Sequence, residues 1–288
     1  MPLVSALAAS HAPNILLEPG REWEDFMDLH YSMAPHGSAN RPTLEQQKKL
    51  RYDAEIAFST LRADLERAQP DVLIVIANDQ FVNFFWNNIP TFFVTIADRV
   101  HGQFTRHKFD YQNHKELGNA IVRAGMEKGI DFSYGEHIEL QHTQTVPLYF
   151  LLPQPTLPIL PIYVNTWVDP APSPRRCYQV GELIRQVANS AKERVAILAT
   201  GGLSHFPGSP RIGEIDEHFD HQLLEVMRKG EGRSLINYSV QDLLHAGDTE
   251  FLNWMVVIGA VGDAKATYTA YMPDFVATGW GFVSWQLV

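Results

Sequence analysis

Histidine, acidic and amide side chains follow several apolar segments of this chain, at positions where they could act in catalysis or bind a metal. Three such segments are Ser10-His11-Ala12-Pro13, Asn78-Asp79-Gln80 and Thr200-Gly201-Gly202-Leu203-Ser204-His205. Each comes directly after a run that is typical of a buried strand. Because the carboxyl ends of parallel strands form the ligand-binding edge of an open α/β sheet, we expect His11, Gln80 and His205 to converge there.

His205 fits two interpretations when it is considered alone. The paired glycines, Gly201 and Gly202, permit a tight turn that leaves this imidazole at the end of a strand. Imidazole exchanges protons near neutral pH, so the residue could act as a general acid or base. A surface turn would have the same local pattern, and the other strand ends must decide between the two interpretations.

Two further residues are of the same chemical kinds. One is His142, which lies in a polar segment before Val146 and Pro147. The other is Glu250, which would lie in the first turn of a helix capped by Asp248 or Thr249 and running to about Val261. A carboxylate is stabilised at that place by the helix dipole, and the spacing alone favours this structural role for Glu250.

Short apolar segments alternate with amphipathic ones along the chain. Strand patterns occur at Leu3 to Ala9, Asp71 to Ala77, Ile159 to Val164 and Val195 to Ala199. Helical patterns occur at Leu44 to Gln69, His114 to Lys128, Arg176 to Lys192 and Glu214 to Lys229. This alternation predicts an α/β fold, a single domain over residues 1–288 with a central, mostly parallel sheet flanked by helices in layers. Residues 18–41 have no clear period, which predicts a long ordered loop or lid.

The composition excludes several classes of protein. With 288 residues and 45% hydrophobic residues the chain can bury a large core. Its apolar runs are far shorter than the ~20 residues that cross a bilayer. The amino-terminal segment lacks the basic region of a signal peptide, so we expect a cytoplasmic protein with no membrane partner. A net charge of -10 disfavours nucleic acid as a partner and favours a small molecule. The single cysteine, Cys177, excludes a multi-cysteine metal site, so oxygen and imidazole would hold any metal.

Five segments occur in the same order as in the class III extradiol ring-cleavage dioxygenases, a family that the chain resembles over nearly its whole length. They are Ser-His-Ala-Pro at 10–13, Asn-Asp-Gln at 78–80 followed by Asn88-Ile89-Pro90-Thr91-Phe92, His142 with Thr145-Val146-Pro147-Leu148, Thr-Gly-Gly-Leu-Ser-His at 200–205, and the segment around Glu250. Within the family they are most similar to the catalytic beta subunit of protocatechuate 4,5-dioxygenase. The resemblance implies that the chain opens the ring of a catechol, gallate or aminophenol-type aromatic, with a small aromatic substrate and dioxygen as partners.

The resemblance also implies a site for non-haem Fe(II), with zinc or manganese as alternatives. In the family two histidines and a glutamate hold the metal, and His11 matches the first histidine while Glu250 matches the glutamate. Such a ligand set leaves positions on the metal open for substrate and dioxygen. His205 matches the general acid and base of the family, and His142 matches a second active-site histidine that hydrogen-bonds substrate or oxygen.

Gln80 departs from the family pattern, because it stands where the better-known relatives have the second ligand histidine. Its amide oxygen could bind the metal, as a neutral donor that suits harder cations than imidazole does. Alternatively, another histidine such as His36 replaces it, or the chain binds metal poorly and belongs to a non-catalytic branch. We take His11, Gln80 and Glu250 as the expected ligands, and keep a metal-dependent hydrolase and a non-catalytic dioxygenase subunit as alternatives.

Arg211 is the expected substrate-binding cation, since an arginine fork pairs well with a substrate carboxylate and this arginine follows His205 closely. The resemblance further implies a homo-oligomer. In some relatives a small helical partner subunit is present, and such a partner is a second possibility for this chain.

Overall fold

The central strands of the molecule are buried on both faces. The computed structural model describes residues 3–32, 41–207, 209–275 and 278–287. Along β2 (Val72–Ala77), Ile74 and Ile76 pack into one core, while Leu73 and Val75 pack into the other. Such strands appear in the sequence as continuous apolar runs, because both faces of the sheet are covered.

Within the described residues, eight strands form one sheet in the order β10-β11-β1-β9-β2-β8-β3-β6. The bounds of the other seven are β1 (Leu3–Ala9), β3 (Phe92–Thr95), β6 (Ser133–Gly135), β8 (Ile159–Val164), β9 (Val195–Thr200), β10 (Tyr268–Pro273) and β11 (Gly279–Gln286). The neighbours β1, β9, β2 and β8 are parallel, whereas β3, β10 and β11 add antiparallel pairs. The predicted α/β fold is confirmed, with the parallel part at the centre of a mixed sheet.

A smaller sheet lies outside this one. It consists of β5 (His107–Gln112), β4 (Arg99–Phe104) and β7 (Glu139–Leu140). Its buried side chains join the same core as α2 and α4, so the small sheet covers part of that face.

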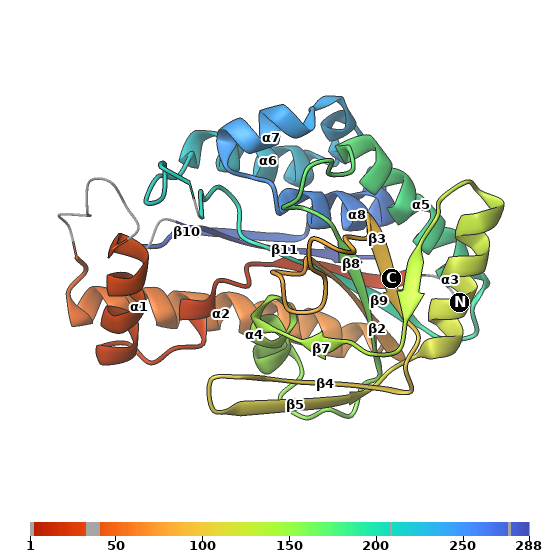
Figure 1. Cartoon of the computed structure of the whole chain (residues 1–288), viewed down its shortest axis with the longest axis horizontal. Helices are drawn as coiled ribbons and strands as arrows, with labels where there is room; N and C mark the ends of the chain where they lie inside the picture. Colours follow the sequence, from red (N-terminus) through yellow and green to blue (C-terminus); the bar gives the residue numbers. More distant parts are fainter. Residues whose placement is uncertain (1–2, 33–40, 208, 276–277, 288) are drawn as a thin grey trace.

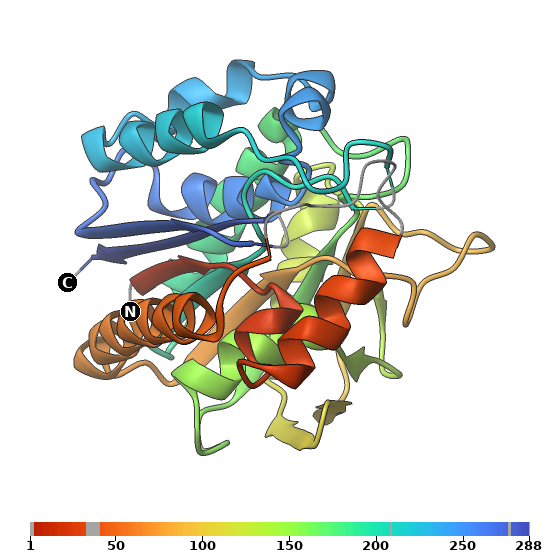
Figure 2. The same cartoon turned by 90° about the vertical axis from the view of Figure 1, so that its left-hand side faces the viewer.

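Helices cover both faces of the large sheet (Figures 1 and 2). One core includes α3 (Lys115–Glu127), α5 (Pro174–Ser190), α6 (Glu217–Lys229), α7 (Val240–Ala246) and α8 (Phe251–Val261). The other includes α1 (Arg21–Ser32), α2 (Leu44–Ala68) and α4 (His142–Leu151). Two 3₁₀ turns are η1 (Pro13–Ile15) and η2 (Gly232–Asn237). In the described part of the chain, no helix has both the length and the apolar character needed to cross a bilayer.

The ends of α2 illustrate why its range is predictable from sequence. Thr43 caps its first turn, where its hydroxyl accepts from the Gln46 N–H and the Gln46 side chain accepts from the Thr43 N–H. At the other end Gln69 adopts a left-handed conformation just before Pro70, which cannot continue the helix. The other predicted helical segments form α3, α5 and α6, with ends that differ by a few residues.

The prediction of a loop over residues 18–41 is wrong where α1 forms. Trp23 and Met27 lie one turn apart and are both buried, and the rings of Trp23 and Trp280 meet edge to face at 6.2 Å. Trp23, Phe26 and Met27 have the i, i+3, i+4 spacing of one helix face, a short signal that the Pro, Gly and Ser residues on either side of α1 obscure in the sequence. His36, considered above as a replacement metal ligand, lies outside the described residues.

Close packing of α8 against α5 fixes the element that directly follows Glu250. A Cβ atom on Gly259 would lie 2.0 Å from the Tyr178 carbonyl oxygen, and one on Gly181 would lie 1.9 Å from that of Val256. Both distances are far below van der Waals contact, so the two helices approach this closely only because these positions are glycines.

We therefore expect Gly259→Ala to lower the free energy of unfolding by about 2–3 kcal/mol, because the added methyl group forces the helices apart. Alanine is intrinsically the better helix former by about 1 kcal/mol, so a loss would report the clash and not helix propensity. Urea denaturation would measure the change, and Gln186→Ala on the exposed side of α5 is the control, expected to stay within about 0.5 kcal/mol of wild type. Unchanged or increased stability of Gly259→Ala would contradict the packing account.

Candidate active site

Backbone hydrogen bonds hold the turns after β1 and β9 side by side at one edge of the sheet. The Gly201 N–H donates to the Ala9 carbonyl oxygen at 3.1 Å, and the Ser10 N–H donates to that of Gly281 at 2.9 Å. The turn after β2 reaches the same place, since Gln80 lines a cavity there together with His11 and His205. The structure thus brings the three strand-end residues together.

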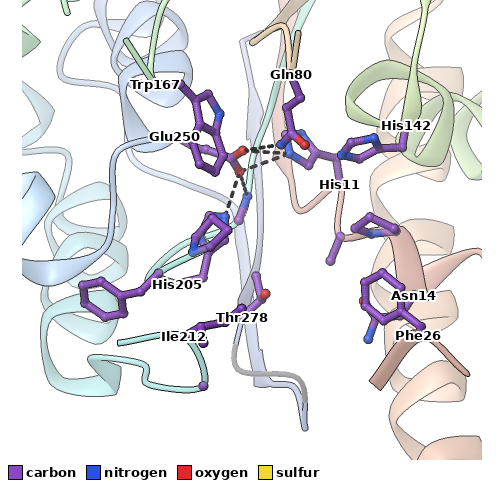
Figure 3. A pocket seen from close by; sticks show the side chains of 16 residues that line it. His11, Asn14, Phe26, Gln80, His142, Trp167, His205, Ile212, Glu250 and Thr278 are labelled. Atoms are coloured by element: carbon purple, nitrogen blue, oxygen red, sulfur yellow. Dashed lines mark hydrogen bonds and ion pairs between the residues drawn. The ribbon is translucent and has the colours of Figure 1, made fainter. Parts of the chain in front are cut away.

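The side chain of Glu250 lies at the centre of this edge (Figure 3). It is fully buried. Its oxygens have as neighbours Asn78 Nδ2 (3.0 Å), His11 Nε2 (3.1 Å), Gln80 Nε2 (3.2 Å), the Gly202 N–H (2.9 Å) and His205 Nε2 (3.7 Å). Every one of the three strand-end segments therefore contributes at least one group to this carboxylate.

These neighbours keep the carboxylate ionised although it is buried. Burial alone would raise the pKa of Glu250, but the charges of His11 and His205 lower it, and hydrogen bonds from His11 and the Gly202 N–H add to that effect. The net result is a pKa well below the ordinary glutamate value. Glu250 is thus a fixed negative charge that the surrounding groups must compensate.

Glu250 does not have the helix-capping surroundings expected from the sequence. It directly precedes α8, which begins at Phe251, and its side chain makes no capping hydrogen bond. The Phe251 N–H instead bonds to the backbone carbonyl of Asp248 at 3.0 Å. The predicted place of Glu250 at the start of this helix is therefore right to within one residue, but its carboxylate is bound by the strand-end groups and not by the helix.

The ring of His205 is held in one tautomer by its own turn. Its Nδ1 lies 2.8 Å from the Leu203 carbonyl oxygen, which can only accept, so Nδ1 carries a hydrogen. In the neutral ring Nε2 is then the basic nitrogen, and it faces Glu250. The indole of Trp167 meets this imidazole edge to face at 6.3 Å. The geometry leaves Nε2 as the atom that can exchange a proton with a molecule in the cavity.

His11 and His142 form an edge-to-face pair with ring centroids 5.6 Å apart. His11 Nδ1 lies 3.2 Å from Thr200 Oγ1, which orients the ring with Nε2 toward Glu250. His142 begins α4 and lines the same cavity. Burial, and then the charge of His11, lower the pKa of His142 to about 3 against the opposing effect of Glu250. At neutral pH His142 is therefore an uncharged hydrogen-bonding group.

Asn78 is a site residue to which the sequence analysis gives no role. Its Nδ2 donates to Glu250, and its Oδ1 accepts from Asn253 Nδ2 at 3.0 Å, so its amide orientation is fixed. It stands at the end of β2, two residues before Gln80, and that position was the only signal in the sequence. Asp79 between them turns away and accepts from the N–H groups that follow it, which shapes the loop beyond Gln80.

A second buried carboxylate, Asp220, holds the turn that carries His205. It accepts from the Ser204 N–H at 2.9 Å, from Ser204 Oγ at 2.8 Å and from Tyr271 Oη at 2.6 Å. Burial raises the pKa of Asp220, and these hydrogen bonds oppose the increase. Burial, followed by the charge of Asp220, also raises the pKa of the neighbouring Asp248 well above its ordinary value. The contacts of Asp220 show that polar groups, and not only glycines, fix this turn.

The cavity at this edge has a volume of about 250 Å³. Its polar end is formed by His11, Gln80, His142, His205 and Glu250, which are the site residues expected from the sequence. Arg211 is not among the residues that line it. Its guanidinium stacks on the Phe206 ring at 3.7 Å and donates to Glu214 Oε2 at 2.8 Å and the His245 carbonyl oxygen at 2.7 Å.

The donors at the polar end fit a divalent cation if Gln80 contributes its amide oxygen. In the part of the chain that is described, no three His, Cys, Asp or Glu side chains are arranged as a metal site. His11 and Glu250 supply one imidazole and one carboxylate, and a half-turn of the Gln80 amide would exchange Nε2 for Oε1 beside them. Metal-binding histidines usually form a hydrogen bond through the ring nitrogen that does not bind the metal, and His11 Nδ1 forms such a contact with Thr200. One nitrogen and two oxygen donors would then face one point.

Known proteins resemble this chain in sequence. A 2,3-dihydroxyphenylpropionate/2,3-dihydroxicinnamic acid 1,2-dioxygenase of Klebsiella pneumoniae strain 342 is 30% identical over 175 residues, which are 60% of this chain and 54% of that protein. The protein of the same name from Escherichia coli K12 strain DH10B is 29% identical over 179 residues, 62% of this chain and 55% of its own. The aligned region thus spans about half the length of these relatives.

A solved structure and a family model match nearly the whole chain. The crystal structure of an uncharacterized Escherichia coli K12 protein has a TM-score of 0.60 and covers 98% of this chain and 99% of its own, at 12% identity, which supports the fold alone. The family described as the catalytic LigB subunit of aromatic ring-opening dioxygenase matches residues 6–281, a range that includes every strand-end segment of the site. The chain therefore belongs to the LigB family of catalytic subunits of aromatic ring-opening dioxygenases.

Proposed function

We propose that this chain is a metal-dependent extradiol dioxygenase that opens the ring of a catechol, gallate or aminophenol-type aromatic with dioxygen. The observation that carries the proposal is the polar end of the cavity, where His11, Gln80 and Glu250 face one another and His205 Nε2 lies 3.7 Å from Glu250. Family membership favours ring opening over hydrolysis, because the matched family is defined by aromatic ring-opening dioxygenases.

We assign metal binding to His11, Gln80 and Glu250, with Fe(II) as the first candidate and manganese and zinc as alternatives. A metal bound there would supply open positions for both oxygen atoms of a catechol and for dioxygen, and a path for electron density between them. Glu250 gives the cation a charge partner in a buried place, and Asn78 and the Gly202 N–H hold that carboxylate in position.

His205 is the proposed acid and base. With Nδ1 donating to the Leu203 carbonyl, Nε2 can accept the proton of a ring hydroxyl as the substrate enters. The protonated ring is then stabilised by Glu250 and can return the proton to an oxygen of the opened product. His142, which is neutral at the same pH, would accept or donate a hydrogen bond to the substrate without becoming charged.

The direct test is oxygen consumption by protein purified without air and loaded with Fe(II), on a panel of catechols, gallate and aminophenols. Consumption of dioxygen with incorporation of both labelled oxygen atoms into a ring-opened product is the expected result. Cleavage with zinc in the absence of dioxygen would instead indicate a hydrolase. Tight metal binding without turnover of any of these compounds would indicate a non-catalytic subunit.

His205→Gln is expected to lower kcat by about 100-fold or more, since glutamine keeps the polarity of the side chain but cannot transfer the proton. Stopped-flow measurement of ring opening would give kcat, and elemental analysis would show unchanged metal content because this residue is not an assigned ligand. Full activity of His205→Gln would remove the residue from the mechanism.

Glu250→Gln should abolish tight Fe(II) binding, and Gln80→Ala should weaken it by about tenfold or more, because each removes an assigned donor. Gln80→His should strengthen it, since imidazole suits Fe(II) better than an amide oxygen. Anaerobic titration against a competing chelator measures all three, with the exposed Gln154→Ala as control. Wild-type affinity in Gln80→Ala would exclude Gln80 as a ligand.

The metal-free protein should lose stability on acidification partly through His142. Because its folded-state pKa of about 3 is below the unfolded value of about 6.5, the unfolded chain binds this proton first. Stability is therefore lost as the pH falls below about 6.5. Between pH 7 and pH 5 the free energy of unfolding should fall by about 1–2 kcal/mol more in wild type than in His142→Gln. The exposed His218→Gln is the control, and an equal pH dependence of wild type and His142→Gln would contradict this assignment.

A further inference from the structure

We infer that, among the aromatic classes of the proposed function, the cavity favours diols whose further substituent is uncharged and apolar, and that it discriminates against those, such as gallate, that carry a carboxylate. This inference rests on the proposed function, which directs the ring hydroxyls to the polar end of the cavity. The substituent then points to the opposite end. That end differs from what the names of the curated relatives would lead one to expect, since those names contain a propionate and a cinnamic acid.

The end of the cavity away from Glu250 is mainly an apolar collar. Figure 3 shows Glu250 and Gln80 at one end of the cavity and Ile212, Thr278 and Phe26 at the other. Phe26 and Ile212 are the labelled apolar side chains at that end, and Asn14 and Thr278 lie beside them. Pro13, Phe206 and Pro207 add apolar surface to the lining of the cavity. Transfer of a hydrocarbon substituent from water onto these apolar surfaces is favourable. A carboxylate would lose its hydration there, and none of the described lining residues is a Lys or Arg that would offset this cost.

No arginine or lysine is available to pair with an anion there. None of the described residues that line the cavity is Lys or Arg. Arg211 lies near the collar, where its Nε donates to Glu214 and its Nη1 donates to the His245 carbonyl oxygen. The Arg211 guanidinium stacks on the ring of Phe206, and the Arg211 side chain is exposed to solvent.

A buried carboxyl group lies behind the collar. Asn14 lines the cavity, and its Nδ2 donates to Asp274 Oδ2 at 2.9 Å. Asp274 is itself buried, and its Oδ1 accepts from the Thr278 N–H at 2.8 Å. The Asn14 amide and the Thr278 N–H at this end are therefore both bonded to the Asp274 carboxyl group.

The cavity volume also limits the substituent. A dry cavity of about 150 Å³ is enough to hold benzene, so about 250 Å³ accommodates one ring with a short chain. A short alkyl or amide substituent fits this volume as well as a carboxylate of the same length does. We therefore expect the collar to distinguish these substituents by their charge and not by their size.

The test compares 2,3-dihydroxyphenylpropionate with its primary amide, which has nearly the same shape and no charge, and with a 3-alkylcatechol of similar length. Wild-type protein loaded with Fe(II) should cleave the amide and the alkylcatechol with a kcat/KM about tenfold or more above that of the propionate. Calorimetric binding of the three compounds to the metal-loaded protein without dioxygen should give the same order.

Ile212→Arg adds a cation at the half-buried collar and should reverse the preference between propionate and amide. Ile212→Met, of similar length and uncharged, should keep the wild-type order, and Arg211→Ala should leave the propionate values unchanged because its guanidinium is engaged elsewhere.

Binding or turnover of the propionate equal to or better than that of the amide in wild type would overturn the inference. Absence of turnover with an unchanged binding order would instead overturn the proposed function and leave the assigned selectivity supported.

Discussion

The buried charge of Glu250 is the constraint on which the rest of the site depends. A carboxylate without water must be surrounded by donors or cations, because its desolvation is otherwise too costly. Here the donors come from the ends of β1, β2 and β9, so the site requires those strands to be parallel, adjacent and in register. The Gly201–Gly202 turn lets a backbone N–H reach the carboxylate: a Cβ atom on Gly201 would lie 3.0 Å from Glu250 Cβ. The same arrangement that stabilises the charge leaves room beside it for a cation.

Much of the fold follows from the sequence for identifiable reasons. The central strands are continuous apolar runs because helices cover both of their faces, and Thr43 and Pro70 mark the ends of α2. The prediction misses α1, because the short apolar pattern of Trp23, Phe26 and Met27 lies within a segment rich in Pro, Gly and Ser. Nor does it reveal the antiparallel strands β10 and β11. Of these, β11 pairs with β1 and so joins segments from opposite ends of the chain, and β10 pairs with β11.

The site was predictable where residues follow strands and was not predictable where contacts depend on tertiary packing. His11, Gln80 and His205 follow β1, β2 and β9 directly, so the topology brings them together. The local spacing of Glu250 favours a carboxylate that is stabilised by the helix dipole, and only the folded chain shows that this carboxylate meets three strand ends. Arg211 is near His205 in sequence, but the stacking of its guanidinium on Phe206 turns it away. Asp220 supports the His205 turn from α6, a contact that no local pattern announces.

The most direct test of the account is a crystal structure of the protein loaded with Fe(II) without air, in which anomalous scattering locates the ion. The account predicts one ion beside Glu250, bonded to His11 Nε2, to a Glu250 oxygen and to the Gln80 amide oxygen, with His205 Nε2 unbonded and facing the cavity. An ion held by His205 in place of Gln80, or no ion beside Glu250, would contradict the central claim that this buried carboxylate and the three strand ends form the metal site of a ring-opening dioxygenase.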